Sequence, residues 1–291
     1  MSISKTTIGN FELFTIHTGD FKLDGGAMFG VVPKTLWTRG IPADEKNRIQ
    51  MTMRCLLISS KKTNKLYLID NGVGTKFNEK MMGIYDIDFS NHSLEASFKE
   101  HGFTFADVTD VIFTHLHFDH CGGTSFYDSE GNSIFTFPNA AYHVHKKHWD
   151  TAINPNAREQ ASFLKENIEP LKATSRMNLV EDGHEFEPGL STIVVNGHTI
   201  GQQLPKIEGD SKTIVFVADL LPTHVHVPLA WVMGYDMYPA ETLLEKERFL
   251  KEASEQDWFL FLEHDFYQEI IKVDYDGKKF SVSEMKTLND V

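Results

Sequence analysis

The sequence is poor in cysteine, because only Cys55 and Cys121 occur among its 291 residues. Two cysteines cannot form a disulfide framework, so a reducing cytoplasm is the expected location. Long apolar runs are also missing. None approaches the ~18 residues that cross a bilayer, and the first residues contain no apolar core of a secretory signal. The sequence therefore predicts a soluble, cytoplasmic protein with no membrane partner.

Basic residues are outnumbered, with 28 Lys and Arg against 41 Asp and Glu and a formal net charge of −13. This balance argues against nucleic acid as a partner, because phosphate binding needs clustered Lys and Arg. The other proportions are those of an ordinary globular protein, with 41% apolar and 24% charged residues. No short repeat, low-complexity tract or linker-like run divides the chain. We therefore expect a single domain over residues 1–291.

Apolar runs separated by turn residues predict strands in both halves of the chain, each group being followed by helices. The expected strands cover residues 8–16, 51–60, 65–70, 107–114, 134–138, 141–144, 191–195, 213–217, 258–262, 266–274 and 279–283. The expected helices cover residues 77–82 (or a loop there), 91–101, 146–174 with interruptions at Pro155 and Pro170, and 240–253. This order is compatible with two packed sheets that have helices outside.

Four candidate metal ligands follow the apolar run 111–113 within six residues: His115, His117, Asp119 and His120. His115 and His117 are two apart, so in an extended backbone they project to the same side. The other two follow where the chain begins to turn and can point at a neighbouring position. This pattern suits two adjacent metal ions better than one. The alternative is a histidine-rich surface turn, since the chain contains 14 histidines.

Three later apolar runs also end in a candidate ligand, as a complete metal site would require. The run at 194–195 is followed by Gly197 and His198, the run 214–218 ends at Asp219, and the run 259–262 is followed by Glu263 and His264. Because a polar residue terminates each run, we expect all four strand ends to meet at one edge of a sheet.

Other conspicuous residues have simpler interpretations. His143 lies in the expected strand 141–144, and His145 and His148 lie three residues apart at an expected helix start. These histidines are either further metal ligands or surface residues, and we expect them at the surface. Segment 20–37 combines three glycines and a proline with large apolar side chains, which is typical of a loop packed on the core or of a lid over a pocket. Cys121 has no role left once histidines and carboxylates supply the ligands.

Together, these motifs resemble those of the metallo-β-lactamase-fold hydrolases, in the right order from near Met51 to the last histidine. The resemblance implies an α+β fold, a four-layer αββα sandwich of two mixed β-sheets with helices outside. It also implies two divalent metal ions, expected to be Zn²⁺. One ion would be bound by His115, His117 and His198, and the other by Asp119, His120 and His264, with Asp219 bridging them.

Stretches 23–34 and 218–223 resemble a narrower branch, that of the N-acyl-homoserine lactonases and methyl-parathion-hydrolase-like enzymes. An aspartate at position 219 departs from the β-lactamases proper, which tend to carry cysteine or serine there. Residues 200–202 depart from the glyoxalases. The resemblance implies a substrate pocket of large side chains, for which we expect Met28, Phe29, Trp37, His226 and Trp231, together with Met233 and Met237.

The resemblance further implies that a hydroxide shared by the two ions opens a lactone or cleaves a related ester, with N-acyl-homoserine lactones as a candidate substrate. Asp119 and Asp219 are the expected catalytic residues. Tyr235 is either a hydrogen-bond donor to the oxyanion or an ordinary half-buried tyrosine. The alternatives are a glyoxalase-II-like thioesterase, an organophosphate triesterase and a non-catalytic ligand sensor. The expected partner is the small-molecule substrate, and a homodimer is compatible with the sequence.

Overall fold

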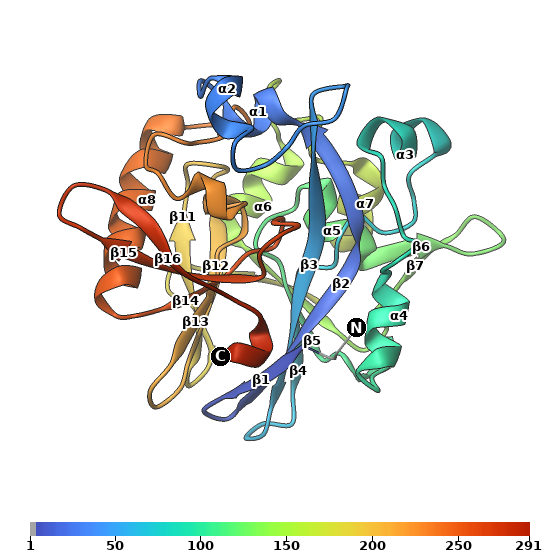
Figure 1. The fold of residues 1–291 in the computed structure, drawn as a ribbon. Coiled ribbons are helices and arrows are strands. Elements are labelled where there is room, and N and C mark those ends of the chain that lie inside the picture. The colour runs from blue at the N-terminus through green and yellow to red at the C-terminus, as the bar shows by residue number, and fades with distance from the viewer. Residues whose placement is uncertain (1–3) are drawn as a thin grey trace.

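Two seven-stranded sheets form the centre of the fold in a computed structural model that describes residues 4–291 (Figure 1). The first sheet has the order β1-β2-β3-β4-β5-β8-β9, and its last four strands run parallel. Its strands are β1 (Lys5–Ile8), β2 (Phe11–Asp24), β3 (Arg48–Ser60), β4 (Leu66–Ile69), β5 (Asp110–Ile112), β8 (Ala141–His145) and β9 (Met177–Val180).

The second sheet contains the seven strands β10 to β16 in chain order, and only β13 and β14 are parallel neighbours. Its strands are β10 (Glu185–Glu187), β11 (Leu190–Val195), β12 (Gln202–Glu208), β13 (Thr213–Phe216), β14 (Phe259–Phe261), β15 (Ile270–Tyr275) and β16 (Phe280–Lys286). A separate hairpin pairs β6 (Ser125–Tyr127) with β7 (Ser133–Phe135). Both large sheets are mixed, as predicted.

Helices cover the outer faces of the two sheets. The helices are α1 (Gly25–Phe29), α2 (Lys34–Trp37), α3 (Glu79–Tyr85), α4 (Leu94–Glu100), α5 (Phe118–Cys121), α6 (Lys146–Ile153), α7 (Lys165–Ala173) and α8 (Pro239–Glu255). In Figure 1, α8 lies beside the second sheet and α4 beside the first. Helix α6 contacts β8 and β9 of the first sheet, and α7 packs in the same core cluster as α4 and α6. The four-layer arrangement expected from the sequence is therefore confirmed.

Strand β3 shows how the sequence produces these layers. Alternate side chains of a strand point to opposite faces of its sheet. Leu56 and Ile58 pack in a core cluster that also contains residues of the second sheet, whereas Cys55 and Leu57 pack in the cluster that contains residues of α4, α6 and α7. Where β3 is buried on both faces by the two clusters, at Cys55, Leu56, Leu57 and Ile58, its sequence is an unbroken apolar run.

The structure differs from the expected elements at several places. Residues 8–16 span a β1–β2 hairpin with the two-residue turn Gly9–Asn10. Segment 20–37, expected as a loop, instead contains the end of β2 and the short helices α1 and α2. The expected helical region 146–174 is interrupted next to Pro155, as predicted, and forms α6 and α7, but the interruption expected at Pro170 was wrong, because Pro170 lies inside α7. Strands β6, β9, β10 and β12 were not expected. These differences depend on packing partners that are distant in sequence. No helix within residues 4–291 has both the length and the apolarity to cross a membrane.

Candidate metal centre

The four predicted strand ends meet, but they come from two sheets rather than one. Strand β5, which precedes His115, belongs to the first sheet, whereas β11, β13 and β14 belong to the second. The expectation of a single sheet edge was therefore wrong. The physical reason is that the two sheets pack against each other, which brings the corresponding ends of their strands together.

Local backbone geometry directs each ligand side chain inward. His117 is still extended, with φ −66° and ψ 155°, and helix α5 begins at the next residue, Phe118, so Asp119 lies in its first turn. Ala218 has a φ of 41°, a left-handed conformation that turns the chain sharply just before Asp219. After α5, an added Cβ at Gly122 would lie 2.0 Å from the carbonyl oxygen of Val73. Glycine at position 122 therefore allows residues 71–74 to pack closely against residues 115–122, the ligand turn that carries His115, His117, Asp119 and His120.

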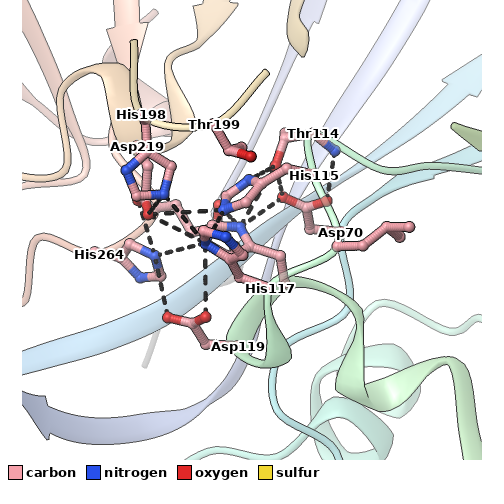
Figure 2. A network of polar contacts seen from close by, with 12 residues as sticks. Asp70, Thr114, His115, His117, Asp119, His198, Thr199, Asp219 and His264 are labelled. Carbon is pink, nitrogen blue, oxygen red and sulfur yellow. Dashed lines mark hydrogen bonds and ion pairs between the residues drawn. The ribbon is translucent and has the colours of Figure 1, made fainter. Parts of the chain in front are cut away.

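All seven predicted ligands lie in two adjoining buried groups, and Figure 2 labels each of them except His120. One group contains His115, His117, His198 and Asp219, the other contains Asp119, His120 and His264, and the ligand atoms of each group lie within 4.8 Å of one another. Asp219 reaches both groups. Its Oδ2 is 3.1 Å from Nε2 of His198, and its Oδ1 is 3.2 Å from Nε2 of His264. This position is the one that a bridging carboxylate requires.

Each of the five histidines is oriented by a polar partner on the ring nitrogen that faces away from the centre. These pairs are His115 Nδ1 with Thr114 Oγ1 (3.0 Å), His117 Nε2 with Glu159 Oε1 (3.2 Å), His198 Nδ1 with Asp236 Oδ1 (3.1 Å), His264 Nδ1 with the carbonyl of Thr52 (3.1 Å), and His120 Nδ1 with Asp70 and Glu263 (3.0 Å each). Such outer partners fix the tautomer and the ring orientation of metal-binding histidines.

The nitrogens that face inward fit a bound cation. His264 donates its Nδ1 proton to a carbonyl, so in the neutral ring its Nε2 carries a lone pair. That Nε2 lies only 3.1 Å from Nε2 of His120, whose Nδ1 faces carboxylates in the same way. Two lone pairs at this distance repel each other unless a proton or a metal ion lies between them. In addition, the buried Oδ1 of Asp219 has no hydrogen-bond partner among residues 4–291.

The electrostatics of the site also favour cations. Six carboxylates surround the five histidines: Asp70, Asp119, Glu159, Asp219, Asp236 and Glu263. Burial alone would lower the pKa of His198, but the charges of Asp219 and Asp236 outweigh it and raise the pKa to about 10. Burial would raise the pKa of Asp219, yet the neighbouring histidines hold it well below its usual value. Two divalent ions would offset most of this negative charge.

The ligands open into a cavity of about 370 Å³. Met28, Met233, Met237 and Tyr235 line this cavity, as do Asp119 and Asp219. Phe29, Trp37, His226 and Trp231 do not line it, which differs from the predicted pocket. Phe29 stacks on Trp37 and on His226, with ring centroids 5.0 and 4.5 Å apart, and it meets Trp231 edge to face. The four side chains therefore form a supporting aromatic cluster behind Met28.

The three histidines expected at the surface are buried. Strand β8 lies inside the first sheet between β5 and β9, so His143 and His145 are covered, and each pairs with an aspartate. Nε2 of His148 accepts a hydrogen bond from the N–H of Leu116 (2.8 Å), and its Nδ1 donates to the carbonyl of Ile200 (2.9 Å). His148 thus ties the ligand turn to the segment that follows His198, a role that sequence spacing does not reveal.

Four acidic residues of the site were not predicted: Asp70, Glu159, Asp236 and Glu263. Asp70 and Glu263 follow apolar strands, and that pattern, which identified Asp219, could have identified them too. Asp70 accepts hydrogen bonds from both the N–H and the hydroxyl of Thr114, as well as orienting His120. Glu159 and Asp236 lie in loops without periodicity, so no sequence signal marked them.

The fold and the ligand motifs are those of a known group of proteins. The sequence pattern described as the metallo-beta-lactamase superfamily matches residues 54–264, and the chain belongs to this superfamily. It is distantly related to N-acyl homoserine lactonases. The chain is 28% identical over 176 residues to the N-acyl homoserine lactonase of Bacillus thuringiensis. It is 25% identical over 169 residues to the N-acyl homoserine lactonase AttM of Rhizobium radiobacter. These matches cover 59% and 56% of this chain and 61% and 60% of the relatives, so the chain spans about three fifths of their length.

Solved structures match over nearly the whole chain. A probable metal-dependent hydrolase from Staphylococcus aureus superposes with a TM-score of 0.86 at 29% identity, covering 97% of this chain and 98% of that one. AidC, named as a dizinc quorum-quenching lactonase in complex with a product, superposes with a TM-score of 0.77 at 21% identity, covering 97% and 96%. The likeness to AidC shows the fold alone.

Proposed function

We propose that this protein is a dinuclear zinc hydrolase that opens lactones, with N-acyl homoserine lactones as the substrate class. The observation that carries the proposal is the convergence of seven buried ligands into two groups that share Asp219. The distant relation to N-acyl homoserine lactonases supports the choice of lactone over other esters.

The first ion would be held by His115, His117 and His198, the second by Asp119, His120 and His264, and both by Asp219. Two such metal ions would supply a nucleophilic water of lowered pKa and would polarise the carbonyl that is attacked. Imidazole and carboxylate are ligand types that Zn²⁺ prefers. The surrounding hydrogen bonds hold the histidine rings in the tautomer and orientation that an incoming ion needs.

Two cavity residues act on the substrate directly. Asp119 lies at the cavity wall, with its carboxylate oxygens 3.8 Å from Nε2 of His264 and 4.0 Å from Nε2 of His120. From this position it can receive a proton and pass it to the departing alkoxide. The phenol of Tyr235 lines the same cavity. Burial and the nearby Tyr85 raise the pKa of Tyr235, so the phenol stays protonated and can donate to the carbonyl oxygen.

The cavity wall suits an acyl chain. Besides its polar end at the metal ligands, the cavity is lined by four methionines and by other apolar side chains: Met28, Met51, Met233, Met237, Leu23 and Phe118. Thioether side chains adapt to irregular apolar shapes. A substrate with a polar ring and a flexible acyl tail fits this cavity, because the ring can lie at the polar end beside the metal ligands and the tail can lie along the apolar wall.

A substrate panel tests the proposal. Initial rates are measured for an N-acyl homoserine lactone, an aryl ester, a phosphotriester and a glutathione thioester. Dominant turnover of the lactone supports the proposal. Dominant turnover of the thioester or the phosphotriester would assign the site to that substrate instead. Binding of a lactone without turnover by the zinc-loaded protein would assign it to ligand sensing.

A further inference from the structure

A second cavity of about 540 Å³ lies on the other side of the aromatic cluster, away from the metal centre. Its walls come from three distant parts of the chain: α2 with the residues after it, the segment that follows the short 3₁₀ helix His224–His226, and the start of β16. Figure 1 shows α2 and the β15–β16 hairpin on the same side of the molecule. None of the proposed metal ligands lines this groove.

The charge of the groove is opposite to that of the protein. Arg39 and Lys279 line it, and no aspartate or glutamate does, although the whole chain carries a formal charge of −13. Neither cation forms an ion pair with any residue in the range 4–291. The nearby Asp276 faces its own hairpin turn, where its Oδ1 accepts the N–H groups of Lys278 and Lys279 at 2.9 Å. The Lys279 charge acts on Asp276, whose pKa it helps to lower, but neither cation has a carboxylate of the described residues within ion-pair distance. Two such cations on facing walls of one cavity are complementary to an anion.

The rest of the groove is apolar. Leu36 is 40% exposed, Trp231 and Val225 are half-buried, and Phe280 is a buried part of the wall. Exposed apolar side chains that surround a cavity mark a binding site more often than an ordinary surface. The two cavities share no lining residue.

We propose that this groove binds a single-chain amphipathic anion, in which an acyl chain ends in a carboxylate. The carboxylate pairs with Arg39 and Lys279, and the chain lies on Trp231 and Leu36. Arginine offers a planar pair of donors that matches a carboxylate, and the apolar wall accounts for the chain. The proposal is independent of the catalytic function, since it concerns binding at residues outside the metal centre.

Titration with decanoate, monitored by calorimetry, tests the proposal. We expect saturable binding of decanoate by the metal-loaded protein and at least tenfold weaker binding of decanol, which has the same chain but no charge. The double variant Arg39→Gln/Lys279→Gln should bind decanoate at least tenfold more weakly. Because neither residue lines the catalytic cavity, this loss distinguishes the groove from binding at the metal centre.

The matched control is Lys62→Gln/Lys251→Gln, which removes two exposed cations elsewhere and should leave decanoate affinity unchanged. Equal affinity of the groove variant and the wild type would overturn the proposal. So would equal binding of decanol and decanoate. Binding to vesicles that contain an anionic phospholipid, without binding of free decanoate, would also overturn it and would assign the groove to a membrane surface.

Discussion

His117 presents Nδ1 to the metal centre, whereas the other four histidines present Nε2, and Glu159 accounts for the difference. The Glu159 carboxylate lies 3.2 Å from Nε2 of His117, is buried, and also accepts the hydroxyl of Thr199. Glu159→Gln retains an acceptor oxygen but removes the charge that strengthens His117 as a ligand. We expect zinc affinity to fall about 10- to 100-fold, as measured by competition with a fluorescent chelator.

The exposed Glu169 of α7 provides the control for this change, and Glu169→Gln should bind zinc like the wild type. Unchanged zinc affinity in Glu159→Gln would show that the carboxylate does not orient His117.

Tyr235 is 40% exposed and lines the cavity beside the metal ligands. If its phenol donates to the carbonyl oxygen mainly in the transition state, Tyr235→Phe should lower kcat about tenfold or more and leave KM nearly unchanged. Steady-state kinetics with the preferred lactone measure both constants. Tyr238→Phe is the matched control, because Tyr238 is similarly exposed but does not line the cavity. An unchanged kcat in Tyr235→Phe contradicts this role.

His226 makes folding stability depend on pH. Burial lowers the pKa of His226 to about 3, and its ring donates to the carbonyl of Met28 at 2.8 Å. The unfolded chain binds a proton near pH 6.5 and the folded one only near pH 3, so stability is lost as the pH falls through that window. The loss is about 1.4 kcal/mol per pH unit for this one residue.

Replacement of His226 by Gln removes this titration. We expect the free energy of unfolding of His226→Gln to fall less steeply than that of the wild type between pH 6.5 and pH 4.5, by up to about 1.4 kcal/mol per unit. Urea denaturation at a series of pH values measures both slopes. Between pH 7 and pH 8 the slopes should coincide, and parallel curves throughout the acid range would refute the assignment.

At the scale of elements, Gly197 fixes the distance between α8 and the turn that carries His198. A Cβ at this position would lie 2.3 Å from Oγ1 of Thr242 and 2.5 Å from its backbone nitrogen. Gly197→Ala should therefore displace α8 or the turn that carries His198 and destabilise the fold by about 1–3 kcal/mol.

Gly83 in α3 gives the opposite expectation, because a Cβ there would meet no atom within 4 Å. Gly83→Ala should stabilise the protein by about 0.5–1 kcal/mol. Thermal unfolding compares the two variants. A Gly197→Ala melting temperature equal to that of the wild type would mean that α8 does not pack this tightly on the turn.

The elements that could be predicted from sequence are those with a strong local signal. Hairpin β3–β4 and helix α8 have clear periodicity and turn residues, and all seven ligands lie at the end of an apolar run or within seven residues after one. Helices α1 and α2 have no such signal, since their position depends on Phe29 packing between Trp37 and His226. Burial of His148 likewise depends on the carbonyl of Ile200, which is 52 residues away.

At the scale of the whole molecule, the metal centre exists because two sheets pack with their ligand-bearing strand ends together. His115 and His117 follow a strand of the first sheet, whereas Asp219 and His264 follow strands of the second. The sequence predicted which residues would meet but not that they would come from separate sheets. Sheet membership depends on long-range pairing, for example β5 with β8 and β13 with β14.

The number of metal ions per chain is the most direct test of this account. Elemental analysis of the purified protein after zinc loading and removal of free metal should find two zinc ions per chain. Asp219→Asn should retain clearly less, because an amide cannot bridge two cations, whereas Asp274→Asn, an exposed change on β15, should still hold two. One ion or none in the folded wild-type protein would contradict the dinuclear centre.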